Sequence, residues 1–331
     1  MADAATLNCS KPQVSTATGA VDASTLAPTR AFAMLSHRGR VRHANQDACA
    51  ALPEHGAFVV CDGMGGAAGG EVASHLATEV FLDCLAHRHC PASGPDAGNS
   101  SEKSSANLNS VPARAPHPSA NGSATRPRAR LAEAIRAANQ AVFRHSRKSP
   151  SLHGMGTTLV ALLWEEDTLR SKDARASSTL WLAHVGDSRC YLFRSGELHL
   201  LTQDHSLVEE QVCAGLLSRV QATASPMRNI ITRAIGSQST VGPEIASHTT
   251  QAGDLYLLAS DGLSHELEDN AIAQILASAV RPSILAASRR NSAAPGAAMQ
   301  SALDSACQAL VEAANANGGR DNITVLLVAC A

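Results

Sequence analysis

Aspartates at the ends of apolar runs limit how this chain can fold more than any other feature of the sequence. Four runs each border one: residues 57–61 lead into Asp62, 180–185 into Gly186 and Asp187, 255–260 into Asp261, and Asp321 precedes 323–328. Apolar runs of this length are typical of buried strands. Because packed sheets bring strand ends together, the pattern predicts a sheet core with several carboxylates gathered at one place.

A single Asp-Gly at a strand end is more often simple turn chemistry. Four such acids on one core are harder to explain in that way, because buried carboxylates raise one another's pKa and a divalent cation relieves the cost. Oxygen ligands without an obvious His or Cys partner suit Mg²⁺ or Mn²⁺ better than Zn²⁺. A carboxylate bridging two such ions is an arrangement for phosphoryl transfer, so the residues indicate a dinuclear metal hydrolase of phosphate esters.

The order of expected elements favours an α+β fold. Further strands are expected at 157–164 and 190–193, and helices at 71–86, 131–145, about 206–217 and about 299–316. The helices show apolar residues at four-residue spacing, and Ser206 followed by Glu209 resembles a capping box. Strands come in runs and helices in pairs, which favours packed layers over a doubly wound parallel sheet.

Two segments are predicted to be disordered. Residues 1–30 are rich in Ala, Ser and Thr and lack apolar periodicity, so we expect a tail. Residues 91–128 contain six prolines and eight serines, and their only large aliphatic residues are Leu108 and Val111. Such a segment cannot bury enough surface to offset its ordering entropy. We expect it to be an insertion in a single domain that spans 31–331.

Composition excludes several classes of protein. A formal net charge of −2 argues against a dedicated nucleic-acid binder. No apolar run approaches the roughly 18 residues that a membrane span needs. The N-terminus lacks the pattern of a secretory signal, and the nine cysteines follow no framework, so we expect reduced thiols and a cytoplasmic protein, with a monomer as the default.

The same acids lie in motifs that resemble those of the metal-dependent protein phosphatases, the phosphatase 2C family. The motifs are SHRGRVRHANQD at 36–47, VCDGMGG at 60–66, GTT at 156–158, VGDSR at 185–189, SDGL at 260–263 and RDNIT at 320–324. Residues 202–206 and 231–236 resemble the two ends of that family's flap segment. The resemblance covers about 33–330 except for the insertion, and six motifs in the family's order make an accident very improbable.

The resemblance implies a fold, a ligand set and a reaction. The fold would be a four-layer αββα sandwich of two antiparallel sheets flanked by helices. Asp62 would bridge two Mn²⁺ or Mg²⁺ ions, the Gly63 carbonyl would bind one of them, Asp261 and Asp321 would complete the first ion's ligands, Asp187 would hold a third, weaker ion with Asp261, and Arg42 would bind the substrate phosphate. Gln46, Asp47 and Asn322 would lie just outside these ligands. A metal-bridging hydroxide would attack phosphoserine or phosphothreonine directly, without a phosphoenzyme.

Two positions depart from the animal members of that family. Gln46 stands where they carry a Glu, and Met64 replaces a histidine proposed as the general acid. A thioether cannot donate a proton, although bacterial members share the Met, so the proton donor is left unassigned. His205 is interpreted as part of the flap structure and His184 as a core residue.

Three functions remain open at this point. The first is an active Ser/Thr phosphatase that opposes a bacterial Ser/Thr kinase, acting on that kinase or its target. The second is a non-catalytic module that binds a phosphoprotein, which would be expected to have lost a metal carboxylate. The third is a phosphatase of small molecules, which would require a closed pocket. All four carboxylates are present, and the flap is typical of protein recognition, so the first is preferred.

Overall fold

The computed structural model describes residues 30–66, 69–87, 125–165, 179–287 and 295–330. The expected tail and most of the expected insertion lie outside these residues. Helix α2 begins at Thr125, so its first residues overlap the end of the insertion expected at about 91–128. Within the described residues, no helix is both long and apolar enough to cross a membrane.

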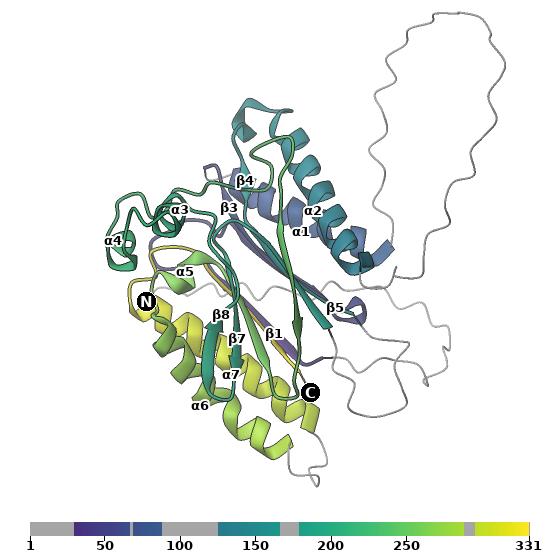
Figure 1. Ribbon diagram of the computed structural model, residues 1–331, viewed down its shortest axis with the longest axis vertical. Coiled ribbons are helices and arrows are strands. Elements are labelled where there is room, and N and C mark those ends of the chain that lie inside the picture. The colour runs from purple at the N-terminus through teal and green to yellow at the C-terminus, as the bar shows by residue number, and fades with distance from the viewer. Residues whose placement is uncertain (1–29, 67–68, 88–124, 166–178, 288–294, 331) are drawn as a thin grey trace, which may run out of the picture.

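Two antiparallel sheets form the centre of the fold (Figure 1). One has the order β1 (Phe32–His37), β11 (Ile323–Ala329), β10 (Leu255–Ala259), β7 (Arg189–Arg194) and β8 (Glu197–Leu200). The other has the order β2 (Asp47–Leu52), β3 (Ala57–Met64), β5 (Leu159–Glu165), β6 (Thr179–Val185) and β9 (Glu244–Thr249), with β4 (Gly156–Thr157) paired to β3. The continuous apolar runs are the strands that lie at or next to the middle of each sheet.

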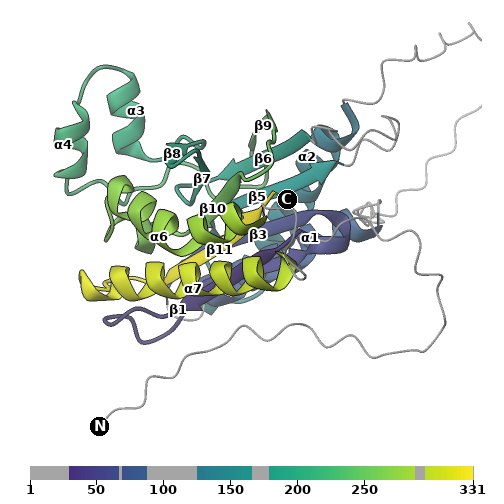
Figure 2. The same ribbon diagram turned by 90° about the horizontal axis from the view of Figure 1, so that it is seen from below.

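Helices cover the outer face of each sheet (Figure 2). The longer helices are α1 (Gly69–His87), α2 (Thr125–Ser146), α6 (Asp269–Ala287) and α7 (Pro295–Ala316). The first pair packs on the β3 sheet through residues such as Phe81 and Ile135, and the second on the β11 sheet through Leu276 and Leu310. Between the sheets lies a third cluster that includes Phe58. The expected αββα sandwich is therefore confirmed.

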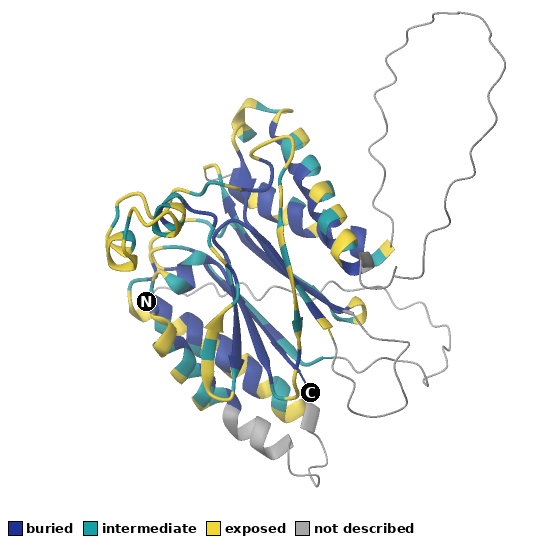
Figure 3. Cartoon of the chain, in the orientation of Figure 1, coloured by how far each residue is buried: buried dark blue, intermediate teal, exposed yellow. Residues whose placement is uncertain are grey.

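Short helices lie at the edges of the sandwich. They are α3 (Leu207–Cys213), α4 (Arg219–Thr223), α5 (Asp261–Ser264) and the 3₁₀ turns Pro53–His55 and Pro150–Leu152. Figure 3 shows buried residues along the inner strands and the inner faces of the long helices, whereas α4 is largely exposed and α3 is mostly of intermediate burial. The segment that carries α3 and α4, residues 202–236, is called the flap below.

Several local expectations need correction. The strand expected at 157–164 is two strands, β4 and β5, which pair with β3 in the same register. Between them, the Asp62 N–H donates to the Thr158 hydroxyl instead of to a backbone carbonyl. The helix expected to reach 217 ends at Cys213. Ser206 does cap it by accepting from the Glu209 N–H, but the Glu209 carboxylate binds Arg219.

The cysteines also need one correction. Cys61, Cys190, Cys213, Cys307 and Cys330 are free thiols. Cys84, however, is disulfide-bonded, so the expectation of uniformly reduced thiols is wrong at that position.

Candidate active site

A cleft of about 510 Å³ gathers most of the residues that the sequence singled out. The expected site residues that line it are Arg42, Gln46, Asp62, Gly63, Asp261 and Asp321. Asp47, Asp187 and Asn322 are buried and do not line the cleft. Segments from both sheets therefore contribute to one site, as expected for strand ends that meet.

The end of β3 places Asp62 by backbone hydrogen bonds on both sides. Its N–H donates to Thr158 Oγ1 at 2.9 Å, and its carbonyl accepts from the Thr158 N–H at 2.8 Å and the Thr157 hydroxyl at 2.8 Å. Across the β2–β3 ladder, Asp62 is the register partner of Asp47. The Asp62 backbone is thus fixed on the strand, and its side chain reaches the cleft.

Gly63 is required by the close approach of three backbone segments. A Cβ at this position would run into the carbonyl oxygens of Gly70 and Gln46. The Gly63 N–H also donates to the Gln46 carbonyl at 3.2 Å. The first turn of α1 and the segment before β2 therefore press against the end of β3, and only glycine fits between them.

Asn322 joins the Arg42 segment to the start of β11. Its side-chain nitrogen donates to the carbonyls of Arg38 at 3.0 Å and Ala44 at 2.9 Å, and its Oδ1 accepts from the Gln46 N–H at 2.8 Å. The side chain of Asn322 therefore makes three hydrogen bonds to the backbone of the segment 38–46. This bonding fixes the loop that carries Arg42 next to Asp321.

Arg42 and Asp321 form an ion pair at the rim of the cleft. Arg42 Nη2 lies 2.7 Å from Asp321 Oδ2, with side chains 51% and 31% exposed. The Asp321 Oδ1 atom accepts from the Asn322 N–H at 2.8 Å. The guanidinium is thus held beside the carboxylates while half of it still faces solvent.

The buried carboxylates are electrostatically unfavourable without a cation. Burial raises the pKa of Asp62 well above its usual range, and repulsion from Asp47 and Asp261 adds to this effect. Burial also raises the pKa of Asp187 and of Asp261, and the two carboxylates are close enough for Asp261 to raise the pKa of Asp187 further. Burial raises the pKa of Asp47 to about 7, although the Ser260 hydroxyl donates to it at 2.8 Å.

Unpartnered oxygen atoms show what would fit this site. Within the described residues, one buried carboxylate oxygen of Asp187 and one of Asp261 have no hydrogen-bond partner. Buried polar atoms normally have a partner, so these oxygens have coordinating capacity to spare. Several hard oxygen donors with raised pKa values suit a divalent cation such as Mg²⁺ or Mn²⁺.

The sequence reasoning missed part of the cleft wall. Val41, His43, Asn229 and Ile231 also line it, and the last two belong to the flap. Val41 is 62% exposed, which is unusual for a large apolar side chain. Ile231 belongs to the motif at 231–236 that resembles the second end of the flap, whereas no sequence signal pointed to Asn229.

Comparisons with known proteins agree with this geometry. The family model "Protein phosphatase 2C" matches residues 36–305. The Serine/threonine protein phosphatase PstP of Mycobacterium tuberculosis is 33% identical over 296 residues, which are 89% of this chain and 44% of that protein. The chain therefore spans less than half the length of this relative. The Serine/threonine phosphatase stp of Listeria monocytogenes is 30% identical over 88% of this chain and 92% of its own length.

Solved structures show the same fold. The crystal structure of the Mycobacterium tuberculosis phosphatase PstP/Ppp has a TM-score of 0.63 at 31% identity, covering 90% of this chain and 97% of that one. The catalytic domain of PstP in complex with two manganese ions has a TM-score of 0.60 at 30% identity, covering 90% and 96%. With the ordered motifs, the antiparallel sandwich and the carboxylate cleft, these matches establish that the chain belongs to the protein phosphatase 2C family.

Proposed function

We propose that this chain is a metal-dependent protein phosphatase that hydrolyses phosphoserine and phosphothreonine. The observation that carries the proposal is the convergence of Asp62, Asp261 and Asp321 with Arg42 in one cleft. A module that only bound phosphoproteins would not need buried carboxylates that destabilise one another when no cation is bound. The proposal treats residues 31–331 as one phosphatase domain.

The carboxylates and one carbonyl are the groups that would hold the ions. Asp62 and the Gly63 carbonyl lie at the end of β3, and Asp261 and Asp321 face them from the other sheet. Asp187, repelled by Asp261 in the metal-free chain, would share a third, weaker ion with it. Mn²⁺ or Mg²⁺ bound there supplies an activated water and positive charge for the phosphate. The two manganese ions in the PstP catalytic domain support this assignment.

Arg42 would bind the phosphate of the substrate. Its bond to Asp321 uses Nη2, and a guanidinium has five N–H donors in a planar fork. The remaining donors suit two oxygens of one phosphate, which is the geometry that favours Arg over Lys. Asp321 would keep the fork oriented. Met64 lines the same cleft and cannot protonate the leaving oxygen, so that step needs another proton donor.

The substrate we propose is a phosphorylated protein, such as a bacterial Ser/Thr kinase or its target. Half of the Arg42 side chain is exposed, so the phosphate site is open at the rim. The exposed flap borders the cleft through Asn229 and Ile231, which favours a protein chain over a small enclosed molecule. The cytoplasmic location and the monomeric state expected from the sequence belong to this proposal.

Hydrolysis of p-nitrophenyl phosphate and of a phosphothreonine peptide tests the function. We expect turnover in Mn²⁺ that is lost in EDTA and in Asp62→Asn with Mn²⁺. Asp304→Asn, an exposed acid on α7, is the matched control and should keep full activity. Folded wild-type protein without turnover in Mn²⁺ or Mg²⁺ would contradict the proposal.

A further inference from the structure

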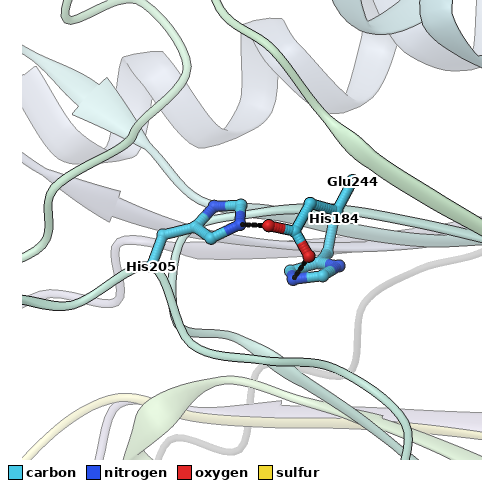
Figure 4. Close-up of side chains that lie close together, drawn as sticks. All are labelled: His184, His205 and Glu244. Carbon is cyan, nitrogen blue, oxygen red and sulfur yellow. Dashed lines mark hydrogen bonds and ion pairs between the residues drawn. The ribbon is translucent and has the colours of Figure 1, made fainter. Parts of the chain in front are cut away.

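A second polar cluster lies outside the cleft, where the flap meets the edge of the β3 sheet (Figure 4). His184 on β6 and Glu244 on β9 are register partners, and His205 from the flap faces both. His205 Nε2 lies 3.1 Å from Glu244 Oε1, and the two imidazole rings stack with centroids 4.8 Å apart. Arg233, at the other end of the flap, donates to the same Glu244 oxygen at 3.2 Å.

Hydrogen bonding fixes which nitrogen of His205 carries the proton. The Gly186 N–H points at His205 Nδ1 at 3.1 Å, so Nδ1 must be the acceptor. The proton of the neutral ring is then on Nε2, where Glu244 accepts it. Arg233 Nη1 also lies 3.3 Å from Nε2, but a guanidinium can only donate, so its acceptor in this tautomer is Glu244 Oε1. Burial and the neighbouring His184 and Arg233 lower the pKa of His205, which keeps the ring neutral. Glu244 therefore sets the tautomer that the Gly186 contact needs.

A metal ion is the alternative occupant of this cluster, and the bonding disfavours it. The ligand atoms of His184, His205 and Glu244 all lie within 4.8 Å of one another. However, His184 Nε2 faces the Gln203 carbonyl at 2.9 Å, so it is a donor. His205 Nε2 is a donor as well, because Gly186 occupies its other nitrogen. Neither histidine offers a lone pair toward the centre of the cluster.

His205 also holds the Gly186 backbone from a second direction. The His205 N–H donates to the Gly186 carbonyl at 3.0 Å, and the His205 carbonyl accepts from the Thr232 N–H at 2.8 Å. On its opposite side Gly186 packs against Thr158, where a Cβ would collide with the threonine side chain. The turn that presents Asp187 is thus clamped between Thr158 and the base of the flap.

We propose that His205 is a positioning residue: in the tautomer set by Glu244, its imidazole fixes the Gly186–Asp187 turn and so ties the flap to the Asp187 ion site. This proposal rests on the proposed function for the identity of that site. It assigns a task to a histidine that does not touch the cleft. Loss of the ring should therefore weaken the ion held by Asp187 and loosen the flap, while the ions at Asp62 keep their affinity.

Measuring manganese binding distinguishes the positioning role of His205 from a general loss of structure. The variants are His205→Ala, His205→Asn and, as the matched control, His199→Ala, an exposed histidine on β8. Electron paramagnetic resonance of free Mn²⁺ gives the number and affinity of the sites without any substrate. We expect His205→Ala to weaken only the weakest site, by about tenfold or more, as for other groups that orient ligands. His205→Asn should restore it, since the Asn Oδ1 can accept from the Gly186 N–H.

Trypsin supplies an independent measure of the flap. Cleavage after the exposed Arg219 or Arg228 should be faster in His205→Ala than in the wild type and unchanged in His199→Ala. Because neither readout uses a phosphorylated substrate, a failure of the phosphatase assay would not be mistaken for a failure of this proposal. Three results would overturn the proposal for His205. They are fewer than three Mn²⁺ sites in the wild type, an unchanged affinity of the weakest site in His205→Ala, and no restoration of that affinity in His205→Asn. If the wild type bound Co²⁺ with a tetrahedral spectrum, and both His205→Ala and Glu244→Ala lost that spectrum, the cluster would be a metal site and the positioning role would be wrong.

Discussion

At the scale of single residues, Asp62 shows that the groups needed for activity work against stability. Its carboxyl is placed opposite Asp47 on the neighbouring strand, and burial together with that neighbour raises its pKa. Without a cation, a carboxylate there costs free energy at neutral pH. We therefore expect Asp62→Asn to raise the Tm in EDTA by about 2–4 °C, equivalent to about 1 kcal/mol, although it abolishes turnover. Differential scanning fluorimetry with Asp304→Asn as control measures the shift, and a lower Tm in EDTA would contradict the argument.

Arg42 is the residue whose replacement should damage turnover without removing a metal ligand. We expect Arg42→Ala to lower kcat/KM for a phosphothreonine peptide by about 100-fold, the usual cost of losing one donor to transition-state charge. Arg42→Lys should recover only part of this, because an ammonium cannot form the planar fork. Steady-state kinetics measures the effect, and Arg136→Ala, exposed on α2, is the matched control. Equal activity of the Ala variant and the control would exclude Arg42 from phosphate binding.

At the scale of elements, the junction of β3 with α1 is where the backbone itself forms the site. A side chain at Gly63 meets backbone oxygens that cannot rotate away. We expect Gly63→Ala to cost about 1–3 kcal/mol and to lower the Tm by several degrees, because overpacked positions relax only by backbone shifts. Gly242→Ala is the matched control, since a Cβ there meets only open space. Thermal unfolding of both variants tests this, and similar Tm values would show that the junction is looser than the structure indicates.

Among the elements, some could be predicted from the sequence and others could not. The inner strands were predictable because both faces are buried, which produces continuous apolar runs such as 57–61 and 323–328. The edge strand β9 was not expected, since it is largely exposed and its residues resemble a loop. The gathering of Asp62, Asp261 and Asp321 was expected from their strand-end positions. The His205 cluster was not, because residues far apart in the sequence meet there: His184 and Glu244 are paired by the register of β6 and β9, and the flap brings His205 back to the Gly186 turn.

At the scale of the whole molecule, stability should depend on pH through two sets of groups with opposite signs. Burial raises the pKa values of Asp62, Asp187 and Asp261, and that of Asp47 to about 7. In the metal-free chain their contribution is fully present below the unfolded pKa near 4 and is lost as the pH rises through the folded values. Burial lowers the pKa values of His184 and His205, so their contribution is present above about 6.5 and is lost as the pH falls.

Mn²⁺ separates these two sets, because it acts on the carboxylates and not on the histidines. At pH 5.5 the ion must displace protons from the buried carboxyls, whereas at pH 7.5 it meets carboxylates whose repulsion it removes. We therefore expect the Tm increase caused by Mn²⁺ to be larger at pH 7.5 than at pH 5.5. In Asp62→Asn the increase should shrink at both values, while the acid loss due to the histidines persists. Thermal unfolding with and without the ion at the two pH values provides the measurement. An increase independent of pH would mean that the carboxyls are already ionised at pH 5.5, and that the cleft is less costly to charge than its burial implies.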